Sequence, residues 1–468
     1  MRLFFAVMCL MLVPIALRDA AIPVSASESA GKSTTLYDPN PAHIWNRLND
    51  ALFIREDSTG AKYGEDSLDP LLFLQTEHLL AQPSHERAMR VLDEFLQTHA
   101  ENQIHDPVKR ALLQRDLWAV FDWSVRQVSF SQRPPYDAEK RELQSRLAEV
   151  LLRLALTPKE IESLPANYGE AVASGAFAKA YDPAHRDSAF LPPGLFDPRG
   201  PWVLISGGFY FVPQLVAMDH VSAFSGRERF LVYMRLPGGR KATFDYLQTL
   251  WSFPQPWVPT NFLDSPSRAE ANPNLPSFPA GTEVALVRQM NLFDNRGNLL
   301  NAPITESVQM RVYRSIPASA QQLTEPRNRA DVIARSGQDF YEIKLSRAQL
   351  FAGDAGGLRA VARDEIEFSS FRQHGDDLFE ESVENHTPLG KQLPALQECV
   401  FCHSQPGINS LETRRRLLWP NEGQHDDPKH DYGPGPFWWD TDQTIDWKQD
   451  RYDWGLLNGY WRSAGSLR

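Results

Sequence analysis

The spacing of apolar residues changes once along this 468-residue chain, and the change constrains the fold more than any other feature. Before about residue 180, apolar residues recur at helical intervals, as in Leu143, Leu147, Val150 and Leu151. Beyond about residue 200 they alternate with polar residues, as in 308–312, which is the period of a strand with one buried face. The sequence therefore predicts an α+β multidomain protein, with an N-terminal helical bundle and a central antiparallel β domain, either a sheet or a sandwich.

Capping and turn residues predict where individual elements begin and end. Helices are expected to start near Asn40-Pro41, Ser84, Asp106-Pro107 and Asp137. Two apolar segments flank Asp294-Asn295-Arg296-Gly297, a sequence that favours a hairpin or a longer strand connection.

One short motif indicates a specific chemistry. Cys399 and Cys402 are separated by two residues, and His403 follows directly, which is the spacing C-x-x-C-H. Two thiols at this spacing can reach the two vinyl groups of one haem while the adjacent imidazole turns onto the iron. The motif is therefore typical of a c-type haem attachment site.

Two other uses of the paired thiols compete with haem. A thioredoxin-like dithiol needs a preceding strand, but 392–397 contains no β-branched run. A zinc site could combine Cys399, Cys402 and His403 with a fourth ligand such as His425, although structural zinc usually has a second ligand pair and no Cys follows Cys402. A zinc-stabilised exported binding protein without haem is thus the alternative to a haem protein.

The amino terminus favours haem over these alternatives. Residues 1–17 form a basic start and a short apolar run broken by Pro14, and Val24-Ser25-Ala26 resembles a cleavage site. The run is too short for a comfortable membrane span, so we expect 1–26 to be a secretory signal peptide of a periplasmic or otherwise exported protein that has no membrane span after cleavage. Of the three cysteines only Cys9 lies in this segment, so the mature chain keeps just the two thiols of the motif, and no disulfide framework explains them.

These features resemble those of c-type cytochromes, although the resemblance covers only the signal peptide and residues 399–403. It implies one haem c attached through thioethers to Cys399 and Cys402, with His403 as the proximal iron ligand. The expected segments, in chain order, are a signal peptide at 1–26, a disordered leader at 27–36, a helical domain at 37–190, a β-rich domain at 200–372 with a proline-rich loop at 252–280, and a c-type haem-binding segment of irregular structure at 380–468.

The second axial ligand is less obvious from the sequence. In small class I cytochromes a Met beyond the motif fills this position, but no Met follows Met310 in this chain. Either a histidine binds the iron or the sixth position is open. The histidine candidates are His425, His430, His374, His386 and, from the β-rich region, His220.

The tail after the motif is rich in aromatic residues. Six of the twelve tryptophans lie beyond residue 403. Such side chains would either pack on a haem or dock the tail onto the rest of the protein, and the sequence favours neither.

The net charge of the chain narrows the possible partners, and the sixth ligand of the iron separates electron transfer from an enzyme or sensor function. A formal net charge of -11 argues against nucleic acid and anionic membrane surfaces, and is compatible with a basic redox partner protein. Iron with two fixed ligands suits electron transfer, whereas an open sixth position would suit a peroxidase-like enzyme or a small-ligand sensor. Electron transfer is the favoured expectation; the partner and any catalytic residues are not predicted.

Overall fold

The computed structural model describes a defined part of the chain, and every structural statement below concerns that part. The described residues are 35–56, 60, 62–66, 72, 76–126, 136–209, 212–214, 217–254, 257–259, 269–272, 274–316, 336–365, 379, 396, 403, 405–411, 417–420 and 443–463. The predicted signal peptide lies outside them, as does the predicted leader apart from its last two residues.

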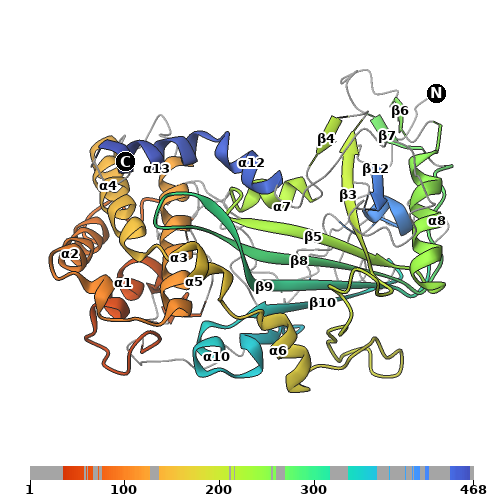
Figure 1. Ribbon diagram of the computed structural model, residues 1–468, viewed down its shortest axis with the longest axis horizontal. Coiled ribbons are helices and arrows are strands. Elements are labelled where there is room, and N and C mark those ends of the chain that lie inside the picture. Colours follow the sequence, from red (N-terminus) through yellow and green to blue (C-terminus); the bar gives the residue numbers. More distant parts are fainter. Residues whose placement is uncertain are drawn as a thin grey trace, which may run out of the picture.

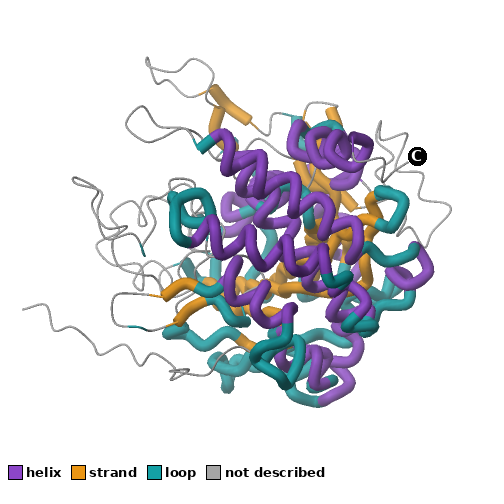
Figure 2. The backbone as a smooth tube through the Cα atoms, turned by 90° about the vertical axis from the view of Figure 1, so that its left-hand side faces the viewer, coloured by secondary structure: helices purple, strands orange, loops and turns teal. Residues whose placement is uncertain are grey.

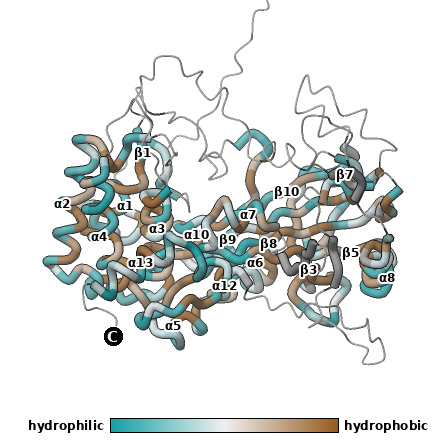
Figure 3. The backbone as a smooth tube through the Cα atoms, turned by 90° about the horizontal axis from the view of Figure 1, so that it is seen from above, coloured by the Kyte–Doolittle hydropathy of each residue, from teal (hydrophilic) through white to brown (hydrophobic). Residues whose placement is uncertain are grey.

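Several helices gather at one end of the molecule, the main sheet extends away from them, and one further helix lies at the far end of the sheet (Figure 1). The α-helices are α1 (Ile44–Phe53), α2 (Ser84–Gln97), α3 (Pro107–Arg126), α4 (Asp137–Leu154), α5 (Pro158–Glu162), α6 (Asn167–Ser174), α7 (Met218–Ala223), α8 (Gly239–Trp251), α10 (Arg347–Ala352), α12 (Gln443–Gln449) and α13 (Tyr452–Ser463). Helices α1 to α4 pack together with α13, and in the side view they lie in front of the strands (Figure 2). These helices carry both apolar and polar residues (Figure 3), as expected for helices that bury one face, but α3 is buried on all sides from Ala111 to Ser124.

One antiparallel sheet forms the rest of the core. Its strands are β3 (Val203–Phe209), β4 (Val212–Gln214), β5 (Glu228–Arg235), β8 (Thr282–Phe293), β9 (Leu299–Tyr313), β10 (Gln338–Leu345), β11 (Leu358–Ala360) and β12 (Leu417–Pro420). The order across the sheet is β11-β10-β9-β8-β5-β3-β12, and β4 pairs with β3. The protein therefore has the predicted mixed α+β architecture; the domain boundaries stay a prediction.

Short elements complete the described fold. Strands β1 (Arg55–Glu56) and β2 (Lys62–Tyr63) form one antiparallel pair, and β6 (Trp257–Pro259) and β7 (Ala269–Ala271) form another inside the proline-rich segment 252–280. Three short 3-10 helices are η1 (Ala100–Asn102), η3 (Ala355–Gly357) and η5 (Gly407–Ser410).

Local signals in the sequence predicted several boundaries correctly. Helices α2, α3 and α4 start at Ser84, Pro107 and Asp137, as expected. Strands β8 and β9 form a hairpin in which Phe293 pairs with Leu299, and the Asp294 carboxylate accepts hydrogen bonds from the backbone N–H groups of the turn. The first helix begins slightly later than expected, at Ile44, because His43 provides its N-terminal cap.

The expectation of a sheet with only one buried face is wrong for β5. Phe230, Val232 and Met234 are buried on one side and Leu231 and Tyr233 on the other. The first three pack into the apolar clusters shared with α7 and α8, whereas the last two join a cluster shared with α5 and α6. Successive residues of β5 therefore point into two different buried cores, rather than alternately into a core and into solvent.

The segment 380–468 was expected to be irregular, but its described part includes the helices α12 and α13, and α13 docks onto the helical group. Trp454 lies with its ring centre 5.8 Å from that of Trp118, and Trp461 lies 4.8 Å from Phe293. The indole N–H of Trp461 donates to the carbonyl oxygen of Ala148 on α4 at 2.7 Å. These two tryptophans of the aromatic tail therefore dock the tail, the second of the two uses expected for such residues. None of the described helices is both long and apolar enough to cross a membrane.

Candidate functional site

The imidazole of His403 is fixed by a hydrogen bond within its own loop. Its Nδ1 lies 2.7 Å from the carbonyl oxygen of Ser410, at the end of η5. A carbonyl oxygen can only accept a hydrogen bond, so Nδ1 carries the proton and donates it. The lone pair of the neutral ring is then on Nε2, which is the atom left to bind a metal.

The loop that presents His403 is anchored on the sheet. The side-chain amide of Gln338, the first residue of β10, donates to the carbonyl oxygens of His403 and Gln405 at 3.0 and 3.4 Å. The hydroxyl of Ser410 lies 2.5 Å from that of Tyr313 at the end of β9. Between these anchors Ile408 is buried in the apolar cluster under α8. The sequence shows no signal for these anchors, because they come from strands distant in the chain.

The electrostatic environment keeps His403 neutral. Desolvation holds the pKa of its imidazole well below the usual value, and the positive charge of Arg311 lowers it further, which outweighs the hydrogen bond to Ser410. Arg311 also donates to the carbonyl oxygen of Ser410 at 3.3 Å. A metal binds the neutral form of histidine, so this environment favours ligation.

A second imidazole lies beside His403. His220 is on the short helix α7, which precedes β5. The ring centres of His220 and His403 are 6.3 Å apart, and their planes are within 6° of parallel. The fold thus brings together one predicted ligand from the C-terminal segment and one candidate from the β-rich region.

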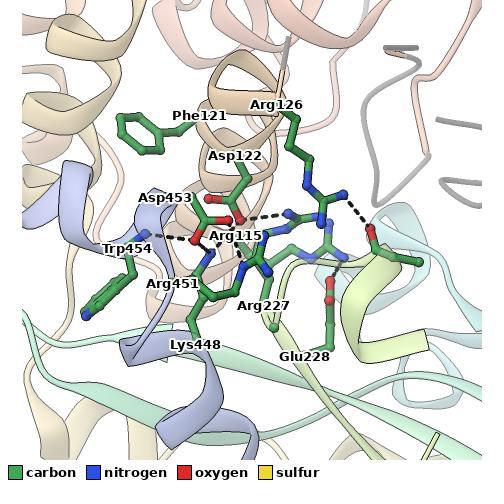
Figure 4. Close-up of polar contacts among 12 residues, drawn as sticks. Arg115, Phe121, Asp122, Arg126, Arg227, Glu228, Lys448, Arg451, Asp453 and Trp454 are labelled. Atoms are coloured by element: carbon green, nitrogen blue, oxygen red, sulfur yellow. Dashed lines mark hydrogen bonds and ion pairs between the residues drawn. The ribbon is translucent and has the colours of Figure 1, made fainter. Parts of the chain in front are cut away.

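Helix α7 is held from two sides. Val221 and Phe224 are buried against Phe230 of β5. From the other side, the guanidinium of Arg126 at the end of α3 donates to the carbonyl oxygens of Ser222 and Ala223 at 2.6 and 3.2 Å (Figure 4). His220 itself is partly buried.

A network of buried charges surrounds the base of α7, and the sequence analysis did not find it. Arg115 of α3 is fully buried with Glu228 of β5 and Glu306 of β9, and its Nε donates to Glu306 at 2.7 Å. Asp122 accepts hydrogen bonds from Arg227 and from Lys448 of α12, both at 2.9 Å (Figure 4). These contacts join α3, the start of β5 and α12 around the helix that carries His220.

The other predicted site residues lie outside the described residues. These are Cys399, Cys402, His374, His386, His425 and His430. Among the residues that the structure describes, no group of three or more His, Cys, Asp or Glu side chains has the geometry of a metal site.

The loop conformation of His403 depends on Gly407, and we predict that an alanine there is costly. The φ of Gly407 is 53°, and a Cβ atom would collide with Oγ of Ser277 and lie 3.1 Å from Cγ2 of Ile316. Gly407→Ala is expected to lower the free energy of unfolding by about 1–3 kcal/mol, measured by urea denaturation. In the control Gly455→Ala, on α13, the added Cβ meets nothing within 4 Å, so stability should stay the same or rise by about 1 kcal/mol. Equal effects of the two substitutions would contradict the packing around Gly407.

No family model matches the chain, and no curated protein or solved structure matches it either. We therefore base the functional proposal on residues 399–403 and on the geometry around His403.

Proposed function

We propose that the protein is an exported c-type cytochrome that carries one covalently attached haem and transfers electrons to or from a partner protein. Cys399 and Cys402 would hold the haem through thioether bonds, and Nε2 of His403 would bind the iron. A bound haem of this type supplies a reversible one-electron couple.

The observation that carries this proposal is the state of His403. Its Nδ1–H is bonded to the carbonyl oxygen of Ser410, which leaves Nε2 unprotonated, and desolvation keeps the ring neutral. Hydrogen bonding of the second nitrogen to a backbone carbonyl is the arrangement that orients metal-binding histidines in proteins. The residue that follows the paired cysteines is thus prepared to act as a ligand.

Anchoring on the sheet also suits electron transfer. Gln338 and Tyr313 hold the His403 loop on β10 and β9, so the ligand is attached to rigid strands. A ligand held in this way moves little when the iron changes oxidation state, which lowers the cost of each transfer. A basic surface on the partner would be attracted by the net charge of -11.

The proposal is tested by expressing the full chain in a bacterium that exports proteins and attaches haem c. The purified protein is expected to keep haem after denaturation, with one iron per chain. Cys402→Ser and Cys399→Ser should each lose stable covalent attachment, whereas Cys9→Ser, in the predicted signal peptide, should keep it. A wild-type protein that carries zinc in place of haem, or a Cys402→Ser variant with normal haem retention, would refute the proposal.

A further inference from the structure

The starting observation is the parallel pair of imidazoles formed by His220 and His403. The two residues come from α7 and from the loop before η5, which are far apart in the sequence. Their rings are within 6° of parallel, with centres 6.3 Å apart. Carbon atoms in contact lie about 3.5–4.0 Å apart, so parallel rings in full face contact would have closer centres.

The distance between the two ring centres equals the distance expected for two imidazoles that bind opposite sides of one metal ion. A five-membered ring with bonds of about 1.3–1.4 Å has a centre-to-atom distance of about 1.15 Å. Bonds from a metal to imidazole nitrogen are about 2.0 Å long. Two ligands aligned through the metal therefore have ring centres about 6.3 Å apart, which is the separation between His220 and His403.

The surroundings of His220 would keep such a ligand in place. Val221 and Phe224 are buried against Phe230, and Arg126 donates to the last carbonyl oxygens of α7. The ring of His220 also lies 5.4 Å, centre to centre, from that of Phe230 on β5. Helix α7 is thus attached both to the sheet and to α3.

We propose that His220 is the second axial ligand of the haem iron whose first axial ligand is His403. This inference rests on the proposed haem attachment at residues 399–403. It names one of the five histidine candidates as the ligand, and the iron would then have no open sixth coordination position. The iron would then change oxidation state between two fixed imidazoles, which suits electron transfer rather than peroxide chemistry or gas sensing.

This ligation also gives the sheet a role at the haem. His403 belongs to the C-terminal segment, whereas His220 precedes β5 in the centre of the sheet. One iron would then add a further link between two parts of the chain that the contacts of Gln338 and Tyr313 already hold together. Loss of His220 would free the sixth position without removing the thioether bonds.

The test compares His220→Ala with wild type in the holoprotein. Wild type is expected to show low-spin iron in absorption and EPR spectra and no binding of carbon monoxide to the reduced protein. His220→Ala should keep covalent haem but become high-spin, bind carbon monoxide, and return to the low-spin state when imidazole is added. Recovery by imidazole shows that the haem site is intact, which separates loss of a ligand from loss of folding.

Two more variants sharpen the result. His220→Met should stay six-coordinate with a higher reduction potential, because a His/Met ligand pair raises the potential of haem. The control His185→Ala removes an exposed histidine that pairs with Asp182, and it should leave the spectrum unchanged.

The possible failures are distinguishable. A His220→Ala protein with covalent haem and an unchanged low-spin spectrum would overturn the assignment of His220, as would a high-spin wild type, and both would leave haem attachment standing. A wild-type protein without covalent haem would overturn both proposals.

Discussion

Arg115→Met is expected to lower the free energy of unfolding by about 3–5 kcal/mol, the usual cost of leaving buried charges without their partner. Arg115 is fully buried, and so are Glu228 and Glu306, which it joins across α3, β5 and β9. Methionine fills a similar volume but provides no positive charge. Urea denaturation of the purified protein, followed by circular dichroism, measures the loss.

Matched variants show whether the lost stability comes from the missing charge or from the change of side chain. Arg90→Met removes an exposed arginine paired with Glu86 at 3.0 Å and should cost less than about 1 kcal/mol. Adding Glu228→Gln to Arg115→Met should restore part of the lost stability, because one buried negative charge is removed with the positive one. A cost for Arg115→Met as small as that of Arg90→Met would show that these charges are not buried as described.

Lys448→Met is expected to cost about 3–5 kcal/mol for the same reason and to loosen the C-terminal helices. The ammonium of Lys448 is fully buried, donates to Asp122 and Asp453 at 2.9 and 3.1 Å, and lies 5.1 Å from the ring centre of Trp118. Without it, two buried carboxylates lose a partner on the surface where α12 meets α3. Faster cleavage of the C-terminal segment in limited proteolysis would accompany the loss.

The pH dependence of this variant follows from Asp453. Desolvation raises the pKa of its carboxyl, but Lys448 and Arg451 more than offset this, so the pKa lies below the usual value. The stability that Asp453 contributes is therefore complete above the unfolded pKa of about 4 and is lost as the pH falls through the folded one. Because Lys448→Met removes the largest of the lowering influences, the gap in stability between wild type and variant should narrow below about pH 4.

Lys241→Met serves as the control for Lys448→Met. Lys241 is exposed and pairs with Asp245 four residues along α8, so its replacement should cost less than about 0.5 kcal/mol at any of these pH values. If the free energies of unfolding of wild type and Lys448→Met differed by the same amount across the acid range, the role given to Asp453 would be contradicted.

The buried network bears on the proposed haem site because it surrounds the support of α7. Asp122 and Arg126 lie one turn apart on α3; Asp122 binds Arg227, at the start of the β5 segment, and Arg126 binds the end of α7. The position of His220 thus depends on charges that lie away from the imidazole itself. Rigid support of this kind is what a metal ligand requires.

Several elements were predictable because their signals are local. Ser84 and Asp137 mark helix starts since capping acts within one turn, and Asp294 to Gly297 marks a hairpin because the turn satisfies its own hydrogen bonds. Strand β5 lies in the region beyond residue 200 that was predicted to form strands, but its second buried face was not predicted, because the topology sets which helices pack on each side.

The sequence by itself determined the chemistry proposed for the protein, because the spacing of Cys399, Cys402 and His403 is a local relationship that one short segment encodes. Only the tertiary structure shows that His220 lies beside His403, with ring centres 6.3 Å apart, because the packing of α7 on β5 brings together two residues that are far apart in the sequence. The same holds for Arg115 and Lys448, whose charges are buried because the fold places acidic side chains from distant elements beside them. Spacing along the chain specifies which groups are available, and folding specifies which of them meet.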